Sequence, residues 1–134
     1  MEPDLKDLVT EEEKKWLRKE LVSIDFKIQS GNLNFDLYLK KSAAELALGL
    51  KQQSIESAKM AVSLNEANIM AWYQLGTAYQ EIGQFKRSRD AYQRALDCFV
   101  KMSDQKKYSK FAEYMLDNME ILELLARTTE KRSR

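Results

Sequence analysis

The stretch W-Y-Q-L-G-T-A-Y, residues 72–79 of the 134-residue chain, decides the fold. Large side chains recur in it at the spacing of helical turns, and the small residue Gly76 lies between them. Two helices approach each other to about 8–10 Å only where the facing side chains are small. Gly76 is therefore a predicted point of close approach, as are Ser88 and Ala95 in the segment that follows. The stretch predicts one helix of a closely packed helical hairpin.

The rest of the chain is also predicted to be helical. It contains one proline and four glycines, is rich in Ala, Leu, Lys, Glu and Gln, and lacks the alternating runs of Val, Ile and Thr that strands favour. Thr10 precedes Glu13 by three residues, which is the spacing of a capping box at a helix start. The pattern predicts six helices joined by short loops, at residues 10–29, 34–48, 51–64, 69–82, 85–100 and 104–127.

The chain also repeats itself at an offset of 34 residues. Small residues recur at this offset, since Ser54 aligns with Ser88 and Ala61 with Ala95. Gly49 aligns with Gly83 at the turn in the middle of each unit. A period of this length with two helices per unit predicts an array of helical hairpins.

W-x-x-L-G-x-x-Y is the signature of the tetratricopeptide repeat, and residues 69–100 resemble that family. Gly83 and Phe85 follow where the family has its mid-repeat turn and the large residue beyond it. The resemblance implies an all-α fold: a short right-handed superhelical array of antiparallel helix pairs with terminal capping helices. The residues expected to pack the repeats are Tyr38, Ser42, Ser54, Ala61, Trp72, Leu75, Gly76, Tyr79, Ser88, Tyr92 and Ala95.

Residues 35–64 resemble a divergent first repeat. The small positions are kept, but Lys41 and Glu45 stand where the family has Leu and Tyr, and Ala58 replaces a large residue. Two explanations are open: this layer is packed differently, or its helix slips by one residue in phase.

These elements predict one domain. A flexible acidic N-terminus at residues 1–9 precedes a single helical domain at residues 10–127, and a basic tail follows at residues 128–134. The domain consists of a helix at 10–29, repeats at 35–64 and 69–100, and a long capping helix at 104–127. In the last helix, Tyr108, Phe111, Ala112 and Met115 take the signature positions.

Members of the tetratricopeptide family bind other proteins along a concave groove lined by the first helix of each repeat. The resemblance therefore implies an adaptor, a chaperone-like protein or an assembly factor, with a peptide or an amphipathic helix as its partner. The implied groove residues are Leu39, Ala43, Leu46, Met70, Tyr73, Thr77, Gln80, Ser109 and Glu113.

Two further expectations concern this groove. The stripe formed by Leu39, Ala43, Leu46 and Leu50 either binds a partner helix, is covered by the chain's own helix at residues 10–29, or is simply core. The resemblance also implies that the carboxylate clamp found in one subset of the family is absent, because Leu39, Ala43, Tyr73 and Thr77 occupy the matching places.

The amino-acid composition excludes several classes of chemistry. The chain has no His and a single cysteine, Cys98, so it lacks an imidazole base, a Ser-His pair and an internal disulfide. No glycine-rich phosphate loop or metal-ligand spacing is present. We therefore expect no catalytic residues, no metal and no cofactor. No apolar run approaches the roughly 20 residues of a membrane helix, which favours the cytoplasm, with the nucleus as an alternative.

The charges leave two alternative functions open. The net charge is only +1, but residues 1–13 carry six acids against one lysine, whereas residues 101–110 and 127–134 each have a net charge of +3. The acidic start and basic end predict, as an alternative, a structural subunit that self-associates into a homo-oligomer. An RNA-contacting helical repeat is a weaker alternative, since no aromatic platform accompanies the basic segments.

Overall fold

The computed structural model describes residues 8–132, and side chains for residues 8–128. Within that part of the chain, the fold is all-helical and contains no strand, which confirms the prediction of an all-α protein. The elements are α1 (Glu11–Gln29), α2 (Phe35–Ala47), α3 (Lys51–Leu64), α4 (Ile69–Glu81), α5 (Phe85–Val100), a 3-10 turn at Lys106–Tyr108, and α6 (Ser109–Arg132).

The first five helices begin and end within one residue of the predicted bounds. Local side-chain caps fix the starts of α1, α2 and α4, whereas α3 and α5 begin without one. The side chain of Thr10 accepts a hydrogen bond from the backbone N–H of Glu13, and Asn34 and Asn68 cap α2 and α4 in the same way. Gly49 and Gly83 end α2 and α4 with positive φ angles of 81° and 78°. Such angles favour glycine, and at both positions they allow the chain to reverse direction into the next helix.

The last helix differs from the prediction at both ends. It begins at Ser109 instead of Asp104, because the side-chain amide of Gln105 donates hydrogen bonds to the carbonyl oxygens of Phe99 and Val100, at 3.2 and 3.3 Å, and holds the preceding segment in a turn. It then continues to Arg132, so the predicted basic tail at 128–134 is helical up to that residue. The last two residues of that tail, and residues 1–7 of the predicted flexible N-terminus, lie outside the described residues.

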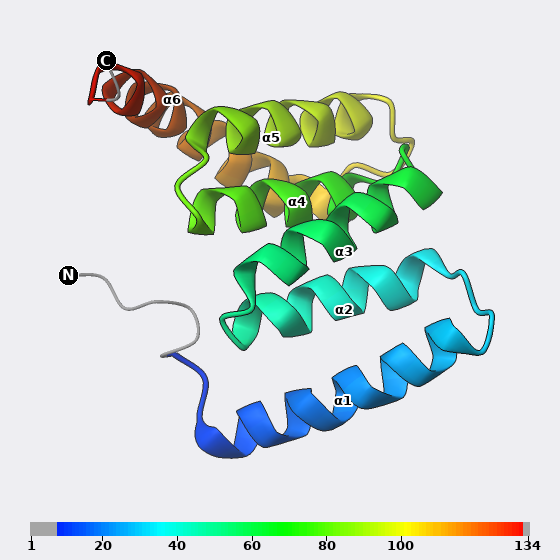
Figure 1. The fold of residues 1–134 in the computed structure, drawn as a ribbon. Helices are drawn as coiled ribbons and strands as arrows, with labels where there is room; N and C mark the ends of the chain where they lie inside the picture. Colours follow the sequence, from blue (N-terminus) through cyan, green and yellow to red (C-terminus); the bar gives the residue numbers. More distant parts are fainter. Residues whose placement is uncertain (1–7, 133–134) are drawn as a thin grey trace.

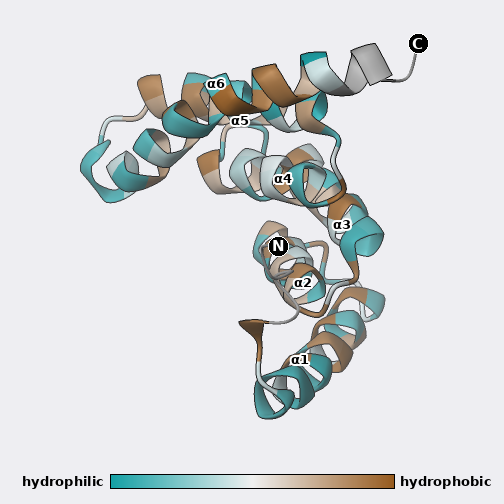
Figure 2. Ribbon diagram, turned by 90° about the vertical axis from the view of Figure 1, so that its left-hand side faces the viewer, coloured by the Kyte–Doolittle hydropathy of each residue, from teal (hydrophilic) through white to brown (hydrophobic). Residues whose placement is uncertain are grey.

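Each helix packs against the next one along the chain, so the helices form a stack that runs from α1 to α6 (Figure 1). Viewed from the side, the stack bends into an arc (Figure 2). An N-terminal hydrophobic cluster is centred on α2, α3 and α4, with Leu46, Ile55 and Leu75 among its buried members. A C-terminal cluster joins α4, α5 and α6 around Tyr92 and Met115. Trp72 packs against both clusters.

The two central hairpins make the same contact at the predicted small positions. In the α4–α5 hairpin, the hydroxyl of Ser88 donates to the carbonyl oxygen of Gly76 at 2.7 Å. In the α2–α3 hairpin, Ser54 donates to the carbonyl of Ser42 at 2.8 Å, and Ser42 donates back to the carbonyl of Ser54 at 2.8 Å. These pairs are related by the 34-residue offset, so α2 has not slipped in phase. Of the two explanations for the unexpected residues of α2, a slip in phase is therefore excluded.

The other residues expected to pack the repeats are also in the interior. Ala61, Tyr92 and Ala95 are fully buried, and Leu75 and Tyr79 are nearly so. Tyr38 and Trp72 are half-buried against the clusters.

Candidate protein-binding groove

Three of the implied groove residues, Tyr73, Thr77 and Gln80, share one face of α4, and Tyr92 from α5 supports them. The hydroxyl of Tyr92 lies 3.1 Å from the Thr77 hydroxyl and donates to Gln80 Oε1 at 3.2 Å. The Thr77 hydroxyl also donates to the carbonyl oxygen of Tyr73 at 2.9 Å. All three α4 side chains are partly exposed, whereas Tyr92 is fully buried. This face of α4 is therefore polar and accessible, and the buried Tyr92 hydroxyl holds its side chains in position.

The position of Tyr92 depends on Gly76. A Cβ atom at Gly76 would lie 2.5 Å from two carbon atoms of the Tyr92 ring, which is shorter than any van der Waals contact between such atoms. Desolvation by burial raises the pKa of Tyr92 well above 10, so its hydroxyl stays neutral and remains able to donate. Gly76 thus allows the Tyr92 hydroxyl to reach Thr77 and Gln80 on the exposed face of α4.

Tyr73 also belongs to an aromatic cluster between α4 and α6. Its ring centroid lies 5.1 Å from that of Phe111 and 6.0 Å from that of Tyr114, both in edge-on geometry, and 5.9 Å from Tyr92 in a stacked one. Edge-to-face and offset pairs of this kind are favourable. Burial raises the pKa of the Tyr73 hydroxyl. Tyr73 therefore contributes to the packing of α6 as well as to the surface.

The remaining implied residues of this half of the groove are less closely grouped. Met70 packs against the C-terminal cluster. Ser109 is half-buried at the start of α6, and its hydroxyl donates to the carbonyl oxygen of Lys106 at 3.1 Å. Glu113 is exposed on α6.

The α2 residues divide between the core and the surface. Leu46 is only 6% exposed within the N-terminal cluster, and Leu39 is half-buried against the same cluster. Ala43 is exposed and lines an open hollow of about 440 Å³ between α1 and α2. The apolar stripe on α2 is therefore partly core and partly the floor of a hollow that α1 helps to form. We call this hollow, whose other walls are Trp16, Leu17, Glu20, Ile24, Lys40 and Ala44, the α1–α2 groove.

The sequence offered the helix at residues 10–29 as one possible cover for this stripe, but it did not name the α1 residues that form the wall. Trp16 and Ile24 had a visible signal, since both belong to an apolar stripe at helical spacing in α1. The sequence does not show which residues of that stripe are buried against α2 and which ones line a hollow. In the structure Ile24 is 5% exposed, whereas Trp16 is 59% exposed at the edge of the groove. The α2–α3 hairpin also differs from the α4–α5 hairpin at Ala58, which occupies the position of Tyr92 at the 34-residue offset.

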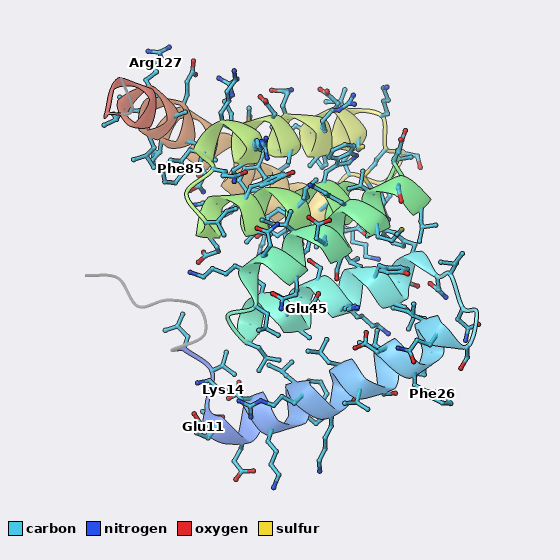
Figure 3. All side chains as sticks on the ribbon, viewed as in Figure 1. Glu11, Lys14, Phe26, Glu45, Phe85 and Arg127 are labelled. Atoms are coloured by element: carbon cyan, nitrogen blue, oxygen red, sulfur yellow. The ribbon has the colours of Figure 1, made fainter. Side chains whose placement is uncertain are left out.

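The two unexpected charges of α2 form a polar network that joins three helices. Lys41 pairs with Asp25 of α1 at 2.8 Å. Glu45, which Figure 3 labels on α2, is buried and accepts a hydrogen bond from the Ser57 hydroxyl of α3 at 2.5 Å. Burial is the main cause that raises the pKa of Glu45, although Ser57 and Lys41 oppose it. Burial lowers the pKa of Lys41, but its hydrogen bond to Asp25 and the surrounding charges outweigh this and raise it. The network connects α1 to α2, and α2 to α3.

A second hollow, of about 430 Å³, lies between the α3–α4 connection and the end of α5. Its walls mix acids and bases, and Arg94 lies 5.2 Å above the Trp72 ring. Cys98 is in this wall, and burial raises its pKa, so the thiol is protonated and a poor nucleophile at neutral pH. Among the described residues, no three His, Cys, Asp or Glu side chains are grouped as metal ligands.

No family model matches the chain, and no curated protein matches it. The part of the chain that the structure describes contains no helix with both the length and the apolarity needed to cross a bilayer.

Proposed function

We propose that this chain is a non-enzymatic, tetratricopeptide-like protein-binding module, and that its partner is an amphipathic helix bound in the α1–α2 groove. The observation that carries the proposal is the groove itself. Its floor is apolar, and Trp16 stands largely exposed at its edge. Large exposed apolar surfaces on soluble proteins are typical of interaction sites.

The chemistry of the groove favours a helix over an extended peptide. Ala43, Ala44 and Ile24 present small and aliphatic side chains, and they leave space for larger side chains of a partner. Glu20 and Lys40 provide opposite charges at the same groove. A helix with apolar residues three and four apart, flanked by charged ones, matches this pattern. The polar face formed by Tyr73, Thr77 and Gln80 extends the contact surface on α4.

The tetratricopeptide-like architecture is part of the same proposal. Its support is the repetition of the serine contacts and of the glycine caps at the 34-residue offset, together with the close approach at Gly76. In this interpretation α6 covers the second repeat with its inner side, through Ala112, Met115 and Leu122.

Substitution of Ala43 by Arg tests the groove. The Arg side chain fills the hollow, and we expect it to weaken partner binding at least tenfold while leaving the fold intact, since Ala43 is exposed. Partners captured by the wild-type protein are purified and titrated against wild type, Ala43→Arg and the control Gln53→Arg, which introduces an arginine at an exposed site on α3. Equal affinity for all three proteins would exclude the groove as the binding site.

A further inference from the structure

The two terminal helices both present apolar side chains on the side that faces away from the stack. Val22 and Phe26 of α1 are 71% and 70% exposed, and Ile121 and Leu124 of α6 are 57% and 64% exposed. Figure 3 shows Phe26 at the outer edge of α1. The end helices of a helical array normally need a polar outer face to remain soluble. These outer faces are therefore candidates for contact with another surface.

Charges of opposite sign accompany the apolar residues on the two faces. On α1, Lys15 and Lys19 precede Val22 and Phe26 at positions i, i+4, i+7 and i+11, which lie on one side of a helix. We call these four residues the basic end face. On α6, Glu113 and Asp117 precede Ile121 and Leu124 in nearly the same pattern, and we call these four residues the acidic end face. All eight residues are exposed.

The charged residues of the two end faces are available for ion pairs with another molecule. Lys15, Lys19, Glu113 and Asp117 make no ion pair within the described part of the chain, whereas Lys14 and Asp25, on other sides of α1, do. The acidic end face also lies in a segment, residues 113–124, that contains four acids and no lysine or arginine.

We propose that the basic end face of one copy binds the acidic end face of another, with α1 parallel to α6. In a single parallel register, Lys15 lies beside Glu113 and Lys19 beside Asp117. The same register places Phe26 beside Leu124, and it brings Val22 to within one residue of Ile121. An antiparallel arrangement would instead bring the lysines against Leu124 and Ile121. The sequence order of charged and apolar residues on the two faces therefore specifies the parallel pairing.

This contact is head-to-tail. The two faces lie at opposite ends of the stack (Figure 1), so each copy can contact two neighbours. Repeated heterologous contacts of this kind produce a ring if they close, and an open filament if they do not. The α1–α2 groove lies on a different side of α1, so the proposal is independent of the groove and its partner.

Charge reversal with complementation tests the proposal by sedimentation velocity. We expect the mass of the wild-type protein to increase with protein concentration, and more strongly at low ionic strength. The variants Lys15→Glu/Lys19→Glu and Glu113→Lys/Asp117→Lys should each remain monomeric at concentrations where wild type associates. An equimolar mixture of the two variants should associate again, because each reversed face then meets a complementary one. The control Lys59→Glu/Lys86→Glu removes two exposed lysines elsewhere and should associate as wild type does.

Cross-linking tests the orientation. In a Cys98→Ser background, a bismaleimide should join Lys19→Cys to Asp117→Cys between copies, and it should not join Lys19→Cys to Leu124→Cys. Efficient linkage of the second pair alone would overturn the parallel register. A monomeric wild-type protein at high concentration and low salt, or a mixture of variants that fails to associate, would overturn the proposal itself. Neither result would bear on the groove, which Ala43→Arg tests separately.

Discussion

The absence of a side chain at Gly76 makes room for the ring of Tyr92, and this contact gives two opposite expectations for Gly76→Ala. Helix propensity alone favours alanine by about 0.5–1 kcal/mol. However, the added Cβ would lie 2.5 Å from ring atoms of Tyr92, which is fully buried and has little room to move. Overpacking of a core costs about 1–3 kcal/mol. We expect Gly76→Ala to lower the free energy of unfolding by an amount in this range, measured by urea denaturation.

The matched control removes the other partner of this contact, the ring of Tyr92. Tyr92→Leu removes the ring, so Gly76→Ala made in that background should cost less than in wild type, and a double-mutant cycle measures the difference. If Gly76→Ala stabilised the wild-type protein, the close approach of α4 and α5 at this residue would be wrong.

At the residue scale, the sequence predicts the small positions well because their signal is the residue type itself. Gly76, Ser88 and Ala95 are small, spaced by helical turns, and buried. The packing of Tyr73 against α6 was harder to predict from the sequence. Its spacing predicts a groove residue, but its contacts with Phe111 and Tyr114 arise from the way α6 crosses α4. That crossing depends on packing between segments about 40 residues apart, which no local pattern specifies.

Among the elements, α1 is attached to the rest of the molecule on one side, by α2. Ile24 is its buried residue, and Asp25 is joined to Lys41 at a partly exposed site. Because elements with few buried contacts open locally at low free-energy cost, we expect the amides of α1 to exchange with solvent faster than those of α4 and α5.

Ile24→Ala should increase this difference. Loss of the buried side chain weakens the contact of α1 with α2, so exchange in α1 should accelerate about tenfold or more, while α4 and α5 keep their protection. The measurement is hydrogen exchange resolved by segment. The exposed substitution Ser23→Ala in the same helix is the control and should leave exchange nearly unchanged. Uniform acceleration in all helices would mean that α1 unfolds only with the whole protein.

Helix bounds were predictable wherever the cap is a local side chain. Thr10, Asn34 and Asn68 each bond a backbone N–H within their own helix. The start of α6 was not predictable in this way, since the turn before it depends on Gln105 reaching back to two carbonyl groups at the end of α5. The α1 wall of the groove was missed for a related reason, because it depends on how one helix rests on another.

At the scale of the whole molecule, Glu45 makes stability depend on pH. Burial raises its pKa above the ordinary value of 4.5, so folding favours the protonated form. The stability that this group contributes is complete below pH 4.5 and is lost as the pH rises through its elevated folded-state pKa. Among the described residues with raised pKa values, the others are lysine, tyrosine and cysteine side chains, which titrate at higher pH.

Glu45→Gln should remove this dependence while keeping a hydrogen-bond partner for Ser57. We expect the free energy of unfolding of the variant, relative to wild type, to increase from pH 4.5 towards pH 7, with a slope below about 1.4 kcal/mol per pH unit, the limit for one proton. Urea denaturation across this range checks it. Glu56→Gln, at an exposed site on α3, controls for the loss of one surface charge. Parallel pH profiles for Glu45→Gln and wild type would contradict the prediction.

Trp72 has a mechanical consequence for the whole molecule. Of the described residues, it is the one that packs against both hydrophobic clusters, and its indole N–H donates to the carbonyl oxygen of Glu66 in the connection between the two hairpins, at 2.8 Å. Loss of the indole should therefore weaken both halves of the arc at once, instead of only the hairpin to which Trp72 belongs.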